Sequence, residues 1–243
     1  LLLKHNFKQT EFIKAVFSEW KWRDHHITFF HSEKNIKVEV HWRLHPGPGK
    51  EEKFQNLWNR RRKSALTKYP VHYLGREDLF NFLVIHGARH GWFRLRWLID
   101  IQKICKEKLD WEYSYNLFES NYNLHQGGQA IILLSELLGV EVIEEMQGFI
   151  RTARARALAN NALFFIENMS NLHTSQLPQE IKKYFYEYIN SLDSTSKSIR
   201  FFLYRLYPNH LDIQTFPLPK KFYFLYFPLH PFLWIWRKFK QPV

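Results

Sequence analysis

The sequence predicts an α+β fold in which a small β-hairpin and helix, residues 1–50, precede an all-helical part with an aromatic C-terminal tail, residues 51–243. Residues 36–44 alternate between apolar and polar side chains, which is the period of a half-buried strand. From residue 77 almost to Pro208, apolar residues instead recur at helical spacing. The composition, 45% hydrophobic and 18% aromatic, is that of a globular chain rather than a disordered one.

The expected elements of the first part are a helix, a hairpin and a second helix. Residues 1–19 have helical spacing, and residues 26–31 and 36–44 form two strands joined by a short polar turn. The Pro and Gly residues at 46–49 end the second strand. Residues 51–68 indicate a polar helix carrying the basic run 60–63, whose charges face either solvent or a phosphate.

The helical part is expected to begin near Glu77 and Asp78, whose negative charge suits a helix start. We expect the region of Gly91 and Trp92 to break this helix. Further helices are predicted over residues 123–138, 144–168 and 179–206. Cys105 lies in a helical run, where we interpret it as a packing residue.

The alternation of the second strand determines which side chains share a face. Ile36, Val38, Val40 and Trp42 fall on one face, and the polar side chains fall on the other. We therefore predict that Glu39, His41 and Arg43 lie on the open face of the sheet.

Two segments together resemble the bacterial proteins described as uncharacterised nucleotidyltransferases, within the polymerase-β-like superfamily. The first is Val38-Glu39-Val40-His41-Trp42, and the second runs from His86 to Ile101. In that family an E/D-x-H-W strand precedes a helix reading roughly H-G-x-x-H-G-W-x-R-L-x-W-L-x-D-I. The resemblance implies that residues 1–50 are the C-terminal part of a nucleotidyltransferase domain. It also implies Mg²⁺-dependent transfer of a nucleoside monophosphate from an NTP to an unknown acceptor, either a small molecule, a peptide or a protein.

By this resemblance Glu39 is the third metal-binding carboxylate and a catalytic residue. The first two come, in the family, from a D-x-D pair after a G-S turn, and no such segment occurs in these 243 residues. We expect that pair in a segment preceding Leu1, and we expect this chain alone to be inactive. The alternative is a solvent-facing Glu39 paired with Lys37 or Arg43.

The expected nucleotide-binding residues are basic, apart from one carboxylate: Arg43, His86, Arg89, His90, Arg94, Arg96 and Asp100. The spacing of the last three is similar to the R-x-K-D-x-x-D motif of nucleotidyltransferase-type toxins. The alternatives are an intrahelical ion pair between Arg96 and Asp100, and a histidine cluster that braces an interdomain interface. His86 and His90 have metal-ligand spacing but lack a third ligand in sequence reach.

Net charge and targeting features limit the partners. Thirty-five Lys and Arg against 23 Asp and Glu give +12, which favours anionic partners or serves solubility alone. No signal peptide is visible, so we expect a cytoplasmic protein.

The alternative to an enzyme is a non-enzymatic basic adaptor that binds nucleotide, nucleic acid or an acidic membrane surface, although no obligate nucleic acid is predicted. The aromatic tail 222–227 would anchor such a membrane contact, but we favour a buried helix that ends the bundle.

Overall fold

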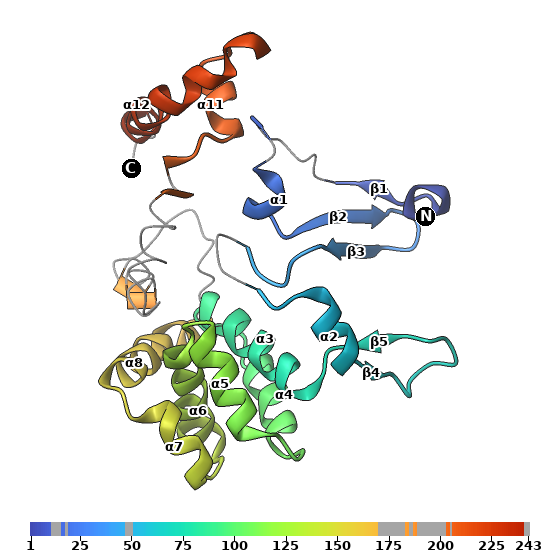
Figure 1. The fold of residues 1–243 in the computed structure, drawn as a ribbon, viewed down its shortest axis with the longest axis vertical. Coiled ribbons are helices and arrows are strands. Elements are labelled where there is room, and N and C mark those ends of the chain that lie inside the picture. The colour runs from blue at the N-terminus through green and yellow to red at the C-terminus, as the bar shows by residue number, and fades with distance from the viewer. Residues whose placement is uncertain are drawn as a thin grey trace. The chain divides into compact units, whose positions relative to one another are not determined.

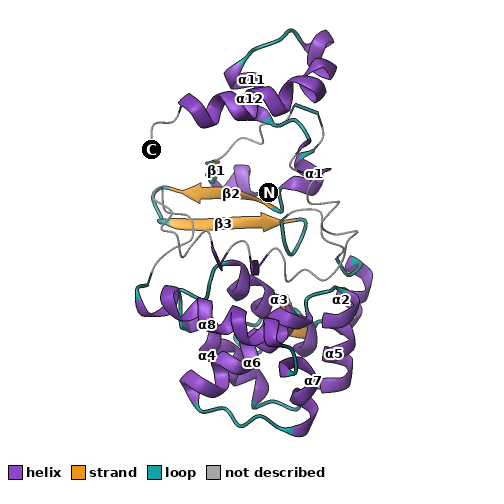
Figure 2. Ribbon diagram, turned by 90° about the vertical axis from the view of Figure 1, so that its left-hand side faces the viewer, coloured by secondary structure: helices purple, strands orange, loops and turns teal. Residues whose placement is uncertain are grey.

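The computed structural model describes residues 1–10, 16, 17, 19–46, 51–169, 183, 184, 187, 188, 203, 204 and 206–240. The chain divides into two compact units. Unit 1 comprises Leu1–Glu51 with Ser196–Val243, and unit 2 comprises Glu52–Thr195. A small antiparallel sheet precedes many helices (Figures 1 and 2), so the predicted α+β class is confirmed. The assignment of residues 1–50 to a nucleotidyltransferase domain stays a prediction.

Unit 1 contains a three-stranded sheet in the order β1-β2-β3. β2 (His26–His31) and β3 (Ile36–His41) form the predicted antiparallel hairpin. The second strand was expected to reach Leu44 but ends at His41. The backbone N–H groups of Trp42 and Arg43 both donate to the carbonyl oxygen of His25, at 3.0 and 3.3 Å, which turns the chain away from the ladder.

The helix predicted over residues 1–19 is wrong for the first ten of them. Leu2–His5 forms a 3-10 turn, η1, and Lys8–Gln9 forms strand β1 on the edge of β2. Asn6 adopts a left-handed conformation with φ 61°, which ends the turn. The ring of Phe7 then packs edge-on against His31, 5.1 Å between centroids. Pairing with a distant strand thus outweighs local helical spacing.

The remaining elements of unit 1 are helical. They are α1 (Trp20–Arg23), α11 (His210–Thr215), the 3-10 helix η3 (Lys220–Leu225) and α12 (Tyr226–Lys240). Aromatic side chains join the N-terminal and C-terminal parts of the unit: Phe17 stacks on Phe227 at 5.4 Å, and Trp22 packs edge-on against Tyr207 at 5.0 Å. The C-terminal helices therefore group with the sheet.

A buried carboxylate holds α11 against α12. Asp212 accepts a hydrogen bond from the backbone N–H of Asn209 at 2.8 Å, which completes a capping box at the start of α11. Its oxygens also lie 2.6 Å from His230 Nδ1 and 2.8 Å from a guanidinium nitrogen of Arg237. Burial alone would raise the pKa of Asp212, but these hydrogen bonds lower it below the ordinary value.

The helix predicted over residues 51–68 is present only in part. α2 covers Phe54–Arg60, after which β4 (Arg62–Lys63) pairs with β5 (His72–Tyr73). An extended backbone separates the charges of the basic run, and its three arginines have different partners. Arg60 makes two 2.9 Å hydrogen bonds to the buried carboxylate of Asp78, and Arg62 pairs with Glu107 at 2.9 Å.

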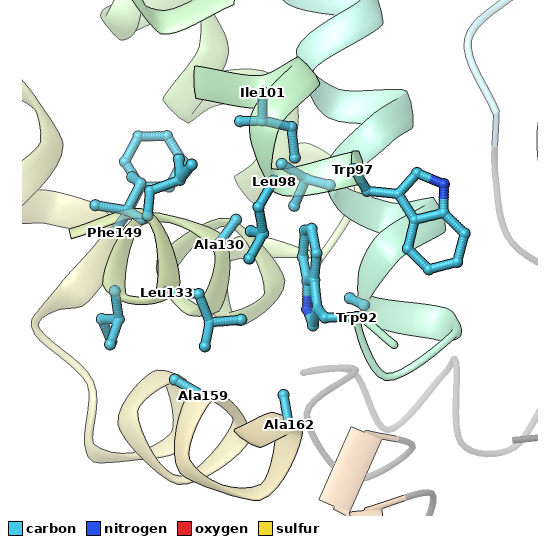
Figure 3. Packing of buried hydrophobic residues seen from close by; sticks show 14 of the residues in the cluster. Trp92, Trp97, Leu98, Ile101, Ala130, Leu133, Phe149, Ala159 and Ala162 are labelled. Atoms are coloured by element: carbon cyan, nitrogen blue, oxygen red, sulfur yellow. The ribbon is translucent and has the colours of Figure 1, made fainter. Parts of the chain in front are cut away.

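Unit 2 continues as a helical bundle. Its elements are α3 (Arg76–Arg89), α4 (Arg96–Cys105), α5 (Trp111–Ser120), α6 (Leu124–Leu138), η2 (Glu144–Met146), α7 (Gln147–Ile150) and α8 (Ala153–Glu167). These match the helices predicted over 123–138 and 144–168, whereas the helix predicted over 179–206 lies mostly outside the described residues. The apolar helix α6 packs against its neighbours α3, α4, α5, α7 and α8, and its buried residues form the centre of the core (Figure 3).

The predicted break between α3 and α4 is confirmed. Gly91 and Trp92 both have positive φ, 65° and 59°, and the Trp92 N–H donates to the carbonyl oxygen of Gly87 at 2.9 Å. This reversal buries the Trp92 indole completely in the core, where Leu98 and Ala130 surround it (Figure 3). The break thereby fixes where the basic residues on either side of it lie.

Candidate functional sites

Glu39 is exposed on β3, as predicted, but the apolar face of the strand is not buried, since Ile36 and Val40 are 44% and 43% exposed. Its Oε1 is 2.6 Å from the ammonium of Lys37, and its Oε2 is 3.4 Å from His41 Nε2. The hydrogen bond from Lys37 holds the pKa of Glu39 below its ordinary value; burial opposes this effect, and the hydrogen bond with His41 adds to it. The alternative interpretation, a carboxylate paired with Lys37, is therefore what the strand shows. A catalytic role stays a proposal.

Three imidazoles lie next to this carboxylate. The hairpin register places His26 directly opposite His41, and their rings stack at 4.9 Å between centroids. His25 Nε2 is 3.1 Å from His26 Nδ1, and the ligand nitrogens of all three histidines lie within 4.8 Å of one another. The sequence analysis missed His25 and His26. The turn between the strands fixes the register and could have placed His26 beside His41.

The donor set around Glu39 does not fit Mg²⁺. This hard cation prefers carboxylate, carbonyl and water oxygens in octahedral geometry. Among the described residues of the hairpin face, Glu39 contributes the only carboxylate, and its near neighbours are one ammonium and imidazole nitrogens. The described residues around Glu39 therefore do not form a Mg²⁺ site.

Arg43 does not share the open face with Glu39 and His41, so this part of the prediction is wrong. It follows the end of β3 and turns inward, with a side chain only 15% exposed. Its guanidinium donates to the backbone carbonyl of Trp22 and lies 3.6 Å from a carboxylate oxygen of Glu51. These contacts tie the strand end to α1, and a nucleotide contact by Arg43 stays a prediction.

The second candidate site lies in unit 2, where α3 meets α4. The rings of His86 and His90 are 4.7 Å apart and cover Trp97 at 5.1 and 5.5 Å between centroids. Arg94 lies on the outside of this group, with its guanidinium carbon 5.0 Å from the centroid of the Phe93 ring. A role of these residues in nucleotide binding stays a prediction.

Among the described residues, Arg89 gives this cluster a positive charge that no carboxylate compensates. A guanidinium nitrogen lies 3.2 Å from His90 Nε2, while its Nε is buried and has no hydrogen-bond partner among the described residues. No carboxylate in the described part of the chain pairs with it. Burial lowers the pKa of Arg89, although the group remains a cation at any ordinary pH.

Arg96 and Asp100 lie on the solvent side of α4. The core side of this helix consists of Trp97, Leu98 and Ile101, which are buried, whereas Arg96 is exposed and Asp100 half-buried. No ion pair joins Arg96 to Asp100 among the described residues, so the predicted intrahelical pair is not observed. Both side chains belong to unit 2 and Glu39 belongs to unit 1. A cleft shared by all three stays a prediction.

The aromatic tail differs from the buried helix that we favoured. Tyr226 and His230 are buried, but most large apolar side chains of η3 and α12 are exposed. The exposed ones are Phe222, Phe224, Leu225, Phe227, Phe232, Trp234, Ile235, Trp236 and Phe239. No helix in the described part of the chain is long and apolar enough to cross a membrane.

Comparison with known proteins finds a match for the first part of the chain. A protein family described as uncharacterised nucleotidyltransferase matches residues 1–139, which is more than half of the sequence. The matched range includes both Glu39 and the α3–α4 junction. No curated protein and no solved structure matches the chain.

Proposed function

This chain belongs to the uncharacterised nucleotidyltransferase family, and we propose that it binds a nucleoside triphosphate through the α3–α4 junction. In a transfer reaction the nucleotide would be the donor of a nucleoside monophosphate. The acceptor would be a small molecule, a peptide or a protein.

The observation that carries the proposal is the charge of Arg89. Buried polar groups in proteins nearly always have a hydrogen-bond partner, and a buried charge without a counterion is costly. The Nε of Arg89 is buried and has no hydrogen-bond partner in the described part of the chain. A phosphate would supply the missing charge, since its oxygens accept two parallel hydrogen bonds from a guanidinium.

The neighbours of Arg89 suit an extended polyphosphate. His90, which follows the end of α3, lies beside Arg89 and packs near His86, and Arg94 adds an exposed guanidinium after the helix break. Arg96, one helical turn before Asp100, would extend the basic surface along α4. The Asp100 carboxylate would then orient a guanidinium or a ribose hydroxyl.

Transfer itself needs more carboxylates than the described residues bring together. The two-metal mechanism uses several carboxylates to hold both ions, and the resemblance assigns only Glu39 to that task. Its surroundings do not fit Mg²⁺, and the 243 residues contain no D-x-D segment. We therefore expect this chain to bind nucleotide without catalysing transfer.

The test is calorimetric titration of ATP and the other NTPs into the 243-residue chain, with Arg89→Ala and Arg89→Lys beside it. Removing a charge-assisted contact costs about 1.5–3 kcal/mol, so Arg89→Ala should weaken binding roughly 10- to 150-fold. Arg89→Lys should restore only part of this loss, because an ammonium cannot bind two phosphate oxygens side by side.

The matched control is Arg151→Ala, which removes an exposed arginine of the same unit. Its affinity should equal that of the wild type. Equal losses in Arg89→Ala and Arg151→Ala would mean that nucleotides bind through net charge alone. Release of pyrophosphate by the isolated chain in the presence of Mg²⁺ would contradict the expected inactivity.

The exposed side chains of α12 favour a second candidate function, attachment to an acidic membrane surface. Phe232 is 70% and Phe239 86% exposed, and Lys220 and Lys221 add positive charge at the start of η3. Exposed aromatic residues with nearby basic groups are typical of helices that lie in the membrane interface.

Cosedimentation with vesicles tests this second candidate. The chain should bind vesicles that contain phosphatidylserine and should not bind vesicles of phosphatidylcholine alone. Phe232→Ser with Phe239→Ser should abolish binding, whereas Phe54→Ser, which changes a Phe that is 73% exposed in unit 2, should leave it unchanged. Equal binding by the control and the double variant would exclude α12 as the anchor.

A further inference from the structure

The end of the β2–β3 hairpin away from its turn carries three imidazoles and one carboxylate that the proposed function does not use together. His26 opens β2, His41 closes β3, and His25 precedes His26. Glu39 lies two residues before His41 on the same face of the strand. We propose that His25, His26, His41 and Glu39 bind one Zn²⁺ ion.

Two pairs of the ligand atoms are spaced as in a tetrahedral zinc site. With Zn–N bonds of about 2.0–2.1 Å, the ligand atoms of a tetrahedral site lie about 3.3 Å apart. His25 Nε2 and His26 Nδ1 are 3.1 Å apart, and His41 Nε2 and Glu39 Oε2 are 3.4 Å apart. The three histidines have ligand nitrogens within 4.8 Å of one another, and Glu39 contacts this group through His41, so binding would draw the four side chains closer together.

The hairpin holds these ligands in place. Register pairing of His26 with His41 fixes the distance between their backbones across the sheet. The carbonyl oxygen of His25 accepts hydrogen bonds from two backbone N–H groups after β3, which positions His25 against the end of that strand. Lys37 contacts Oε1 of Glu39, and so leaves Oε2 directed at His41.

The ligand types select the metal. Imidazole nitrogen suits Zn²⁺, Cu²⁺ and Ni²⁺, whereas Mg²⁺ requires mainly oxygen ligands. Three imidazoles with one carboxylate therefore distinguish Zn²⁺ from the magnesium that the family resemblance implies. The proposal does not depend on nucleotide binding at α3 and α4, because it uses only side chains of the hairpin.

The experiment is calorimetric titration of Zn²⁺ into the metal-free 243-residue chain, with His26→Asn and His41→Asn as test variants. Each should raise the dissociation constant by more than the roughly 10- to 100-fold change that follows loss of an outer-sphere partner. Glu39→Gln should have a smaller effect in the same direction. His5→Asn, an exposed histidine of the same unit, and His86→Asn, in α3, should bind like the wild type.

Three outcomes would overturn the proposal. Zn²⁺ affinity could be unchanged in His26→Asn and His41→Asn, it could be lost in His86→Asn, or millimolar Mg²⁺ could displace the metal. Arg89→Ala should retain full Zn²⁺ binding, so failure of this proposal is distinguishable from failure of nucleotide binding.

A spectroscopic readout covers the case in which a variant fails to fold. Co²⁺ substituted into the wild-type chain should give the visible absorption of a tetrahedral site, and Zn²⁺ should remove it. The imidazole nitrogen resonances of the three hairpin histidines should shift on Zn²⁺ addition, while those of His86 and His90 should not. Shifts confined to His86 and His90, or an octahedral Co²⁺ spectrum, would refute the hairpin site.

Discussion

Gly87→Ala tests whether the α3–α4 junction depends on the close packing of one indole. A Cβ at residue 87 would lie 2.3 Å from Cζ3, 2.5 Å from Cε3 and 2.7 Å from Cη2 of Trp92. All three distances are far inside van der Waals contact. The indole cannot swing aside easily, since it is fully buried and the backbone N–H of Trp92 is bonded to the Gly87 carbonyl.

The expected change in the free energy of unfolding for Gly87→Ala is the difference between two opposing effects. Overpacking a close-packed core costs about 1–3 kcal/mol, and contacts this short belong at the upper end. An alanine in place of glycine inside a helix recovers up to about 1 kcal/mol. Gly87→Ala should therefore lower the free energy of unfolding by about 2 kcal/mol, which the midpoint of urea unfolding followed by circular dichroism would report.

A double-mutant cycle with Trp92→Leu isolates the cause. Trp92→Leu should destabilise by itself, because it leaves a cavity. In that background Gly87→Ala should be neutral or slightly stabilising, since the clashing ring is gone. Asn160→Ala, at an exposed position of α8, is the control for helix propensity alone and should not destabilise. An unchanged cost of Gly87→Ala without the indole would refute the packing argument.

Three further predictions concern single side chains. Arg60→Ala leaves the buried carboxylate of Asp78 without its bidentate partner, and should cost about 3 kcal/mol in urea unfolding; the value is near the lower end for a broken buried pair, since Arg60 is partly exposed. The pKa of Asp212 is lowered in the folded protein, so its stabilisation is complete above the ordinary carboxyl pKa and is lost as the pH falls toward the folded value. Unfolding measured from neutral to acid pH should show this loss in the wild type, and a smaller loss in Asp212→Asn. Burial raises the pKa of the Cys105 thiol to about 12, so a disulfide reagent at neutral pH should label it slowly in the native chain and rapidly in denaturant. Rapid native labelling would contradict its interpretation as a packing residue.

Local patterns predicted the parts of the fold that local interactions determine. Strict alternation identified β3 and the exposed side of Glu39, and the glycine at residue 91 identified the break after α3. The errors lie where residues distant in sequence pair with each other. Lys8 pairs with Phe30 in β1, and Arg62 pairs with Tyr73 in β4, so the helical spacing of both segments was overridden by sheet contacts.

The candidate sites show the same difference between features that depend on local sequence and features that depend on pairing of distant residues. The sequence indicated Glu39, His86 and Arg94 as polar residues in specific patterns, but it did not indicate which of them would acquire partners. The histidine group was missed because it depends on strand register and on His25, which lies outside the alternating segment. A turn of defined length fixes that register and therefore determines which residues lie opposite each other in a hairpin. Such opposite pairs can be examined for metal-ligand side chains from the sequence alone.

Burial without a counterion indicates an anion site more strongly than a run of basic residues does. The run at residues 60–63 suggested a phosphate contact, but Arg60 pairs with Asp78 and Arg62 with Glu107, and the guanidinium of Arg61 lies 3.9 Å above the ring of Trp58. Carboxylates therefore compensate the charges of Arg60 and Arg62, whereas Arg61 contacts the ring and the backbone carbonyl of Trp58. Arg89 follows a buried stretch of α3 and has no such partner among the described residues. Its uncompensated charge is therefore the reason to look for the nucleotide at the α3–α4 junction, before any other basic part of a chain with a net charge of +12.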